Sequence, residues 1–146
     1  MNKQAKLNKV LIDSAFKGNI LKAKAALDLG ANINADGNYA LRCAASDGHL
    51  EVVKFLINNG VNIHAEDNVA LRLAANNGCL EIVKLLINNG ADVHADNNYA
   101  LILATRNGHL EVVKLLIDSG ANVKEAYKNA WNDKQKEILQ RYIKPI

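Results

Sequence analysis

The chain has 146 residues, with 49% apolar, 23% charged and 5% aromatic residues and a net charge of +3. This length and composition fit one folded domain with an aliphatic core and argue against an intrinsically disordered protein. The apolar runs are far shorter than the roughly 20 residues of a membrane span, and the N-terminus lacks the apolar stretch of a secretory signal. Because Cys43 and Cys79 are only two scattered thiols, we expect an intracellular, cytoplasmic protein without disulfides.

Positive charge gathers at the two ends of the chain. Residues 1–34 carry six lysines against Asp13 and Asp28, whereas residues 35–124 are slightly acidic overall. A nucleic-acid footprint needs a continuous basic stripe, and the sequence contains none. We therefore expect neither a nucleic-acid partner nor a membrane partner.

A period of 30 residues organises the chain. Three full copies, at residues 35–64, 65–94 and 95–124, align without gaps, and each pair of copies shares 18 of 30 positions. Residues 1–34 and 125–146 follow the same register less closely, so we interpret them as capping repeats of a single domain, 1–146. Two series of glycines mark the period: Gly18, Gly48, Gly78 and Gly108, and Gly30, Gly60, Gly90 and Gly120.

The N-terminal capping repeat differs from the full copies in its second half. Lys22 and Lys24 fall at the places of Val52 and Lys54. A terminal repeat needs a polar outer face for solubility, so we expect this unit to turn a wetter face to solvent.

Each full copy reads as helix, turn, helix and loop. In the first copy, a helix from Tyr39 to about Asp47 ends at Gly48, and a second helix runs from Leu50 to Asn59 with apolar residues at helical spacing. One helix pair cannot bury both of its apolar faces alone, so the pairs are expected to stack into an all-α solenoid. An asparagine stands before the first helix of each copy and is expected to cap it: Asn38, Asn68 and Asn98.

The C-terminal capping repeat keeps the register through Ala130 and Trp131 and then loses about four residues. It resumes as a helical pattern over DKQKEILQRYI. The residues predicted to face inward are Ile138, Leu139, Tyr142 and Ile143.

The repeated segments resemble the ankyrin repeat family. The matching stretches are ALRCAASDGHLEVVKFLINNG, ALRLAANNGCLEIVKLLINNG and ALILATRNGHLEVVKLLIDSG. The usual ankyrin unit has 33 residues, so each unit here is three residues short, and the loss falls in the hairpin between units. The resemblance implies an ankyrin solenoid of helix-turn-helix units with short hairpin or loop connections, no enzymatic activity and no cofactor. It also implies a partner protein that binds the concave face.

The 30-residue unit, with its N-Y-A-L-R segment, looks like the ankyrin proteins that giant DNA viruses of amoebae encode. The high content of Asn, Ile and Lys agrees with such a source, and it agrees equally with an A+T-rich intracellular bacterium. This resemblance implies a host protein as partner, a role as effector or inhibitor, and the host cytoplasm as location.

Positions that vary between otherwise constant copies mark the surface that we expect to contact a partner. They lie in the hairpins and on the first helix of each copy, and they include Tyr and Arg, which are frequent hot-spot residues. Ile102 also falls at a variable position. The predicted partner-binding residues are Asp36, Tyr39, Arg42, Ser46, Asp47, Glu66, Asp67, Val69, Arg72, Asn76, Asn77, Asp96, Asn97, Tyr99, Arg106 and Asn107.

Two columns of histidine offer a chemical alternative, a metal protein or an enzyme. One column starts the second helices, and the other stands beside acidic residues. Neighbours in a column lie one repeat apart, about 10 Å for packed helices, which is too far for shared zinc ligation. We therefore predict structural histidines, no metal and no catalytic residue, and we interpret Cys43 as a small buried apolar residue. The two columns are His49, Cys79 and His109, and His64 and His94.

A self-associating structural protein is the other alternative. The basic N-terminal unit and the acidic centre of the chain favour it, because they would attract each other between copies. We nevertheless expect a monomer when the chain is free of its partner.

Overall fold

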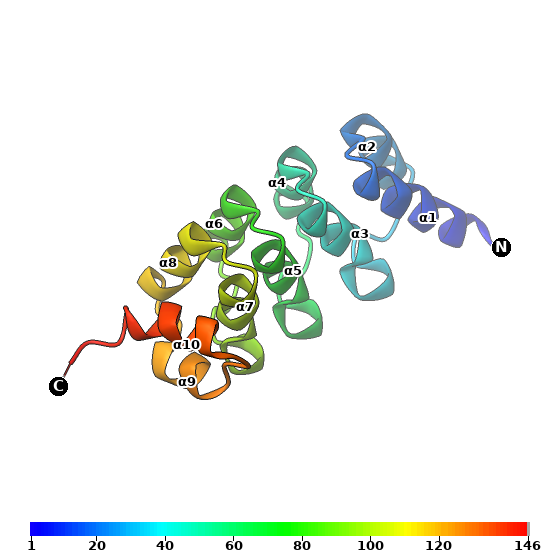
Figure 1. Ribbon diagram of the computed structural model, residues 1–146. Helices are drawn as coiled ribbons and strands as arrows, with labels where there is room; N and C mark the ends of the chain where they lie inside the picture. The colour runs from blue at the N-terminus through cyan, green and yellow to red at the C-terminus, as the bar shows by residue number, and fades with distance from the viewer. Residues whose placement is uncertain (146) are drawn as a thin grey trace. The chain divides into compact units, whose positions relative to one another are not determined.

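The computed structural model describes residues 1–145, and the chain divides into two compact units, Met1–Ala70 and Leu71–Ile146. All regular elements within residues 1–145 are α-helices, which confirms the predicted fold class, and none of these helices is long and apolar enough to cross a bilayer. The first unit holds α1 (Lys3–Phe16), α2 (Ile20–Asp28), α3 (Ala35–Ser46), α4 (Leu50–Asn58) and the start of α5 (Ala65–Asn76), as Figure 1 shows. The second unit holds the rest of α5, α6 (Leu80–Asn88), α7 (Ala95–Arg106), α8 (Leu110–Asp118), α9 (Val123–Lys128) and α10 (Asp133–Gln140).

The helices pair and stack as the repeat period predicts. In the first unit α1 packs on α2 and α3 packs on α4, while α1 also contacts α3 and α2 contacts α4. In the second unit α7 packs on α8, α6 contacts α8, and α7 contacts α9. First helices thus pack on first helices and second helices on second helices, which is how helix-turn-helix repeats bury their apolar faces.

One leucine per repeat lies at the centre of the aliphatic core. Leu11 and Leu41 in the first unit and Leu101 in the second occupy the same register position, and each is at most 1% exposed. Ala44 and Ala104 nearby are 0% exposed, and their small size lets neighbouring helices approach closely. Burial of a leucine side chain contributes roughly 1.5–3 kcal/mol, so this register contributes strongly to the stability of each unit.

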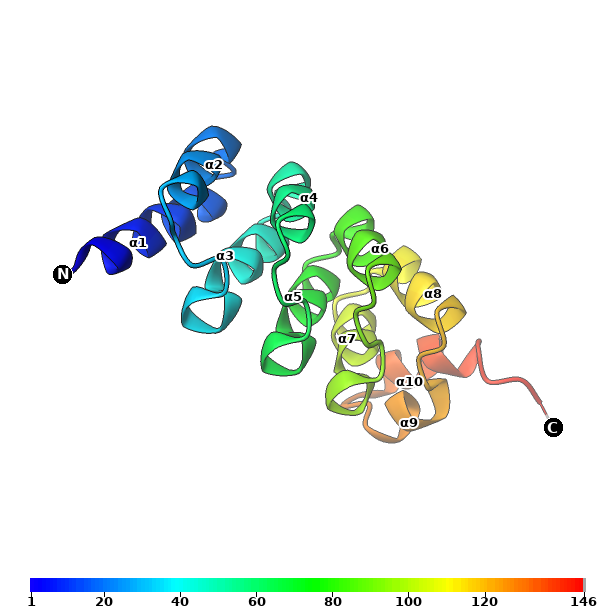
Figure 2. The ribbon, with the colours of Figure 1, turned by 180° about the vertical axis from the view of Figure 1, so that it is seen from behind.

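The connections before the first helices are turns of left-handed helix, so of the predicted hairpin or loop connections the structure has short loops. α3 begins with Asp36, Gly37 and Asn38, whose φ angles are 52°, 64° and 61°, and Figure 2 shows this turn as the wide cyan loop at the start of α3. The same turn opens α5 at residues 66–68 and α7 at residues 96–98. A left-handed helix costs L-residues roughly 1–2 kcal/mol each, and Gly, Asn and Asp adopt it most readily. These three residue types fill eight of the nine positions. A tight turn also suits a repeat that is three residues shorter than the usual ankyrin unit.

Asn38 and Asn98, predicted to cap their own helices, bond instead to the loop that follows the second helix of their own repeat, and Asn98 also reaches the start of the next repeat. Asn38 Nδ2 donates to the carbonyl oxygen of Asn62. Asn98 Oδ1 accepts from the backbone N–H of Asn122 at 2.8 Å, and its Nδ2 donates to Glu125 Oε2 at 2.7 Å. Both asparagines are buried, and these bonds satisfy buried amide groups while they tie each turn to the loop that leads into the next repeat.

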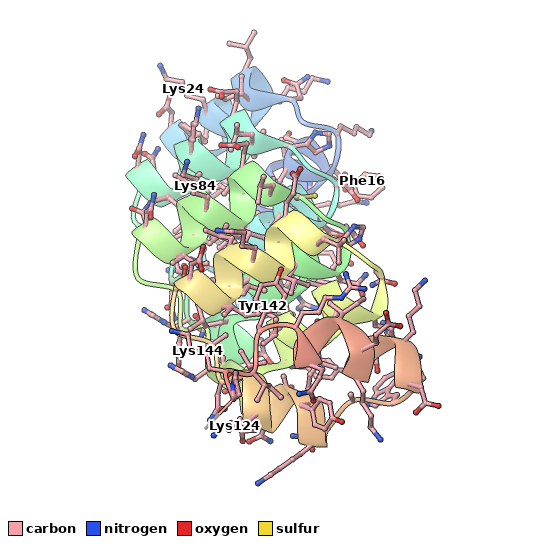
Figure 3. All side chains as sticks on the ribbon, turned by 60° about the vertical axis from the view of Figure 1, so that its left-hand side comes forward. Phe16, Lys24, Lys84, Lys124, Tyr142 and Lys144 are labelled. Atoms are coloured by element: carbon pink, nitrogen blue, oxygen red, sulfur yellow. The ribbon has the colours of Figure 1, made fainter. Side chains whose placement is uncertain are left out.

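The outer surface of the N-terminal capping repeat is mixed in polarity. Lys22 and Lys24 are exposed, as predicted, but Phe16 and Leu21 are also 58% and 78% exposed. Figure 3 shows the side chains of Phe16 and Lys24 projecting from the ribbon. The two lysines agree with the predicted wetter face, while these exposed apolar residues were not predicted.

The C-terminal capping repeat is a short helix pair. α9 has six residues, and α10 packs on both α9 and α7. Ile138 and Leu139 are buried, as predicted. Tyr142 and Ile143 follow the end of α10 and are half-buried, so the helical stripe is shorter than the sequence pattern predicts.

Candidate recognition surface

In the second unit, Arg72 reaches from α5 to the start of α7. Its Nη1 lies 2.7 Å from Asp96 Oδ2, and its guanidinium carbon lies 5.9 Å from the centroid of the Tyr99 ring. The Arg72 side chain is 19% exposed and that of Asp96 is 46% exposed, so water screens this pair less than a fully exposed ion pair. Three predicted site residues from two consecutive repeats thus form one cluster.

A second cluster in the same unit surrounds Trp131. The guanidinium carbon of Arg106 lies 4.8 Å from the centroid of the Trp131 ring, and Arg106 Nη2 lies 3.3 Å from Asn76 Oδ1. Asn107 Nδ2 donates to the same Asn76 oxygen at 2.9 Å. Trp131 remains 61% exposed, so these contacts hold a large aromatic surface in place while it faces solvent.

In the first unit, the predicted residues gather around Tyr39. Tyr39 is 44% exposed, and the guanidinium carbon of Arg42 lies 5.1 Å from its ring centroid. Asp36 and Glu66 lie in the left-handed turns of successive repeats. A β-carbon on Gly37 would stand 3.1 Å from Glu66 Oε1, so the two turns lie side by side, and Asp36 lines the same hollow as Tyr39.

All sixteen predicted site residues are at least partly accessible, whereas Ile102 is not. Ile102 is 4% exposed, so its assignment to the exposed face of the first helix is wrong, because this side of α7 packs into the core. The half-buried site residues are Arg42, Ser46, Val69, Arg72, Asn76 and Tyr99. The exposed ones are Asp36, Tyr39, Asp47, Glu66, Asp67, Asn77, Asp96, Asn97, Arg106 and Asn107.

Trp131 is the surface residue that the sequence analysis missed. Comparison of the three full copies could not find it, because it follows the last copy, where the register is lost. Its only signal is that it is the single tryptophan of the chain, in a chain whose core is aliphatic.

Comparison with known proteins identifies the repeats independently of their period. A family model described as ankyrin repeats (3 copies) matches residues 66–127, and a model described as ankyrin repeat matches residues 36–68. The two matches together span residues 36–127, more than half of the chain. The chain belongs to the ankyrin repeat family. A search of curated proteins found no significant match.

Two histidines of this ankyrin protein hold consecutive repeats together. His49 Nε2 lies 2.8 Å from the carbonyl oxygen of Phe16, and His109 Nε2 lies 3.0 Å from that of Asn76. A carbonyl oxygen only accepts, so Nε2 donates its proton in both bonds. This geometry matches the structural role predicted for both rings. Within residues 1–145, no group of three or more His, Cys, Asp or Glu side chains is placed to hold a metal ion.

Cys43 was predicted to be a small buried residue, and in the ankyrin stack it is half-buried. Burial raises the pKa of its thiol, and the nearby carboxylate of Asp47 raises this pKa further. The thiolate is the nucleophilic form of cysteine. The surroundings of Cys43 therefore disfavour nucleophilic chemistry.

Proposed function

We propose that this ankyrin repeat protein is a non-catalytic recognition module that binds a partner protein through the turns and first helices of its repeats. Ankyrin repeats generally act as protein–protein interaction modules. The observation that carries the proposal is the exposed Trp131 ring with Arg106 stacked against it at 4.8 Å.

Trp131 and Arg106 have the residue types and the restrained side chains that are typical of an interface anchor. Tryptophan and arginine are enriched among the residues that dominate binding energy. Arg106 contacts both the Trp131 ring and Asn76, so it loses less side-chain freedom on binding than an unrestrained arginine. Tyr39 with Arg42 supplies a second aromatic and arginine pair of the same kind.

A selection with matched variants tests this proposal. Binders are selected from a displayed library of protein fragments on the native chain, and their affinities are then measured for two variants. The first variant, Arg106→Ala with Trp131→Ala, removes the proposed anchor. The control, Glu81→Ala with Lys84→Ala, changes exposed residues of the second helix α6 in the same unit, and circular dichroism checks that both variants fold.

We expect most selected binders to lose at least about tenfold in affinity with the first variant and less than about twofold with the control, since hot-spot truncation typically costs more than 1 kcal/mol. Binders that prefer the α6 surface would contradict the proposal. Binders that ignore both changes would contradict it as well, because they would use neither anchor.

We also propose that the partner is a host protein and that the free chain is a monomer. The first part rests on the resemblance of the 30-residue unit to viral ankyrin proteins, and host cell fragments in the displayed library test it against fragments of other cells. The second part predicts a mass near 15.9 kDa in solution, measured by light scattering over a range of concentrations. A mass that rises with concentration would favour a self-associating protein.

A further inference from the structure

The second unit contains a filled binding site for an arginine side chain. The guanidinium of Arg72 pairs with Asp96 at 2.7 Å and lies against the Tyr99 ring at 5.9 Å. A carboxylate at the edge and an aromatic ring at the face are the two groups that a planar guanidinium prefers. We call this arrangement the filled socket. It is formed between two consecutive first helices, α5 and α7.

The first unit repeats the same socket without its arginine. Asp36 and Tyr39 stand 60 residues before Asp96 and Tyr99, so they hold the same repeat positions, but the counterpart of Arg72 is Ile12. A hollow of about 410 Å³ between α1 and the start of α3 is lined by Ile12, Asp36 and Tyr39. Within residues 1–145, Asp36 forms no side-chain hydrogen bond or ion pair. We call this hollow the open socket; α1 and α3 lie side by side there in Figures 1 and 2.

We propose that the open socket binds an arginine side chain of the partner protein. The proposal rests on the proposed recognition function and names the chemistry that one part of its surface accepts. The guanidinium would take the place that Arg72 has in the filled socket, with its edge on the Asp36 carboxylate and its face on Tyr39. An arginine suits this place better than a lysine, because the ammonium group lacks the planar fork.

Two cationic side chains, Arg42 and Lys9, lie near the open socket and leave it accessible. Arg42 lies against the Tyr39 ring at 5.1 Å, but it does not line the hollow, whose other wall is α1. Lys9 lines the hollow from α1 and is exposed. Its ammonium group forms no ion pair with Asp36 in the described chain, and its charge opposes a bound guanidinium. Removal of Lys9 should therefore strengthen binding.

Titration with a capped amino acid measures this chemistry directly. The probe is N-acetyl-arginine amide, added to the ¹⁵N-labelled full chain and followed by two-dimensional NMR. We expect saturable shifts of the amide signals of Asp36, Gly37 and Tyr39, with a dissociation constant in the millimolar range, because a single exposed ion pair is weak. N-acetyl-lysine amide should bind at least about threefold more weakly, and the uncharged N-acetyl-citrulline amide should cause no saturable shift at these signals.

Variants of the socket separate specific binding from general attraction. Asp36→Asn should weaken arginine binding at least about fivefold and leave the fold intact, because asparagine also adopts the left-handed conformation. Lys9→Ala should strengthen it about twofold. Equal binding of arginine and citrulline, or no effect of Asp36→Asn, would overturn the proposal.

The repeat register supplies a reciprocal test. Ile12→Arg should fill the open socket from within and abolish the shifts, whereas the control Ile12→Gln should retain at least half of the affinity. Arg72→Ile should open the filled socket, so that the probe now also shifts Asp96 and Tyr99. Probe binding unaffected by Ile12→Arg would place the probe elsewhere and overturn the proposal. If the amide signals of Asp36, Gly37 and Tyr39 shift as the protein concentration rises, before any probe is added, the open socket binds an arginine of a second copy of this chain. That outcome would overturn the proposal of a partner's arginine.

The failure of this proposal and the failure of the proposed recognition function are distinguishable. If the open socket fails to bind arginine, selected fragments whose binding depends on Trp131 would still support a recognition module. A chain that selects no protein fragments, yet binds arginine at Asp36, would contradict the recognition module alone.

Discussion

A side chain on Gly78 would collide with the ring of His109. An ideal β-carbon at Gly78 lies 2.6 Å from His109 Nδ1, while Nε2 of the same ring bonds the carbonyl oxygen of Asn76 at 3.0 Å. The first unit repeats this arrangement with Gly18 and His49, where an ideal β-carbon at Gly18 again lies 2.6 Å from His49 Nδ1. The glycine that ends one helix thus provides the space in which the histidine of the next repeat makes its bond.

Gly78→Ala should destabilise the protein more than Gly108→Ala. The two glycines have nearly equal φ angles, +71° and +72°, so both substitutions carry the same cost for the left-handed conformation, about 1 kcal/mol. Only Gly78 faces a ring, because nothing lies within 4 Å of a β-carbon at Gly108. We expect the free energy of unfolding, measured by urea titration, to fall by about 1 kcal/mol more for Gly78→Ala.

A double variant isolates the collision. In a His109→Ala background the ring is absent, so Gly78→Ala and Gly108→Ala should then cost the same within about 0.5 kcal/mol. If the difference between the two alanines persists without the ring, the steric explanation is wrong.

The repeat period predicts most of the fold because helix positions follow from apolar spacing. The second helix of the first full copy was predicted from Leu50 to Asn59 and spans Leu50–Asn58. The left-handed turns could not be predicted in the same way. Asn, Asp and Gly favour several kinds of turn, so the residues at 36–38 do not by themselves distinguish a short hairpin from a left-handed turn.

The sequence predicts the location of the candidate site better than its contacts. Variation between copies identified Arg72, Asp96 and Tyr99 as surface residues, but it carries no information on which of them meet. Their cluster depends on how far the Arg72 side chain extends toward the next repeat. That Ile12 holds the repeat position of Arg72 gains meaning only once the contact of Arg72 with Asp96 and Tyr99 is known.

Asp67→Gly should stabilise the protein. Asp67 has a φ of 53° in the left-handed turn of α5, and Gly37 occupies the same position one repeat earlier with a φ of 64°. Glycine relieves the strain of this conformation, although part of the gain is offset by the greater freedom of the unfolded chain. We expect a net gain of about 0.5 kcal/mol in the free energy of unfolding. Asp67→Ala is the control and should lower the free energy of unfolding. A higher free energy of unfolding for Asp67→Ala than for Asp67→Gly would contradict a left-handed turn at this position.

Leu86→Ala should cost about 2–5 kcal/mol, as other large-to-small changes in a packed core do. Leu86 lies in α6 and is 0% exposed. His49→Ala should cost less, about 1 kcal/mol, because it removes one hydrogen bond, to the carbonyl oxygen of Phe16. Urea titrations of both variants give the comparison, and equal costs would contradict the assignment of Leu86 to the core.

Alkylation of Cys43 should shift to higher pH than that of an unstructured thiol. Burial raises the pKa of Cys43 and Asp47 raises it further, while Arg42 lowers it. The reactive thiolate of Cys43 therefore forms at a higher pH than that of an ordinary cysteine. In a Cys79→Ser background, the rate of reaction with iodoacetamide is measured from pH 6 to pH 10, and its midpoint reports this pKa.

Two charge variants should move the midpoint of this pH dependence in opposite directions. Asp47→Asn removes a negative charge that opposes the thiolate, so the midpoint should move to lower pH. Arg42→Gln removes a positive charge that favours the thiolate, so the midpoint should move to higher pH. Shifts in the same direction for both variants would mean that a change of burial, and not charge, controls the reactivity of Cys43, because the two substitutions remove charges of opposite sign.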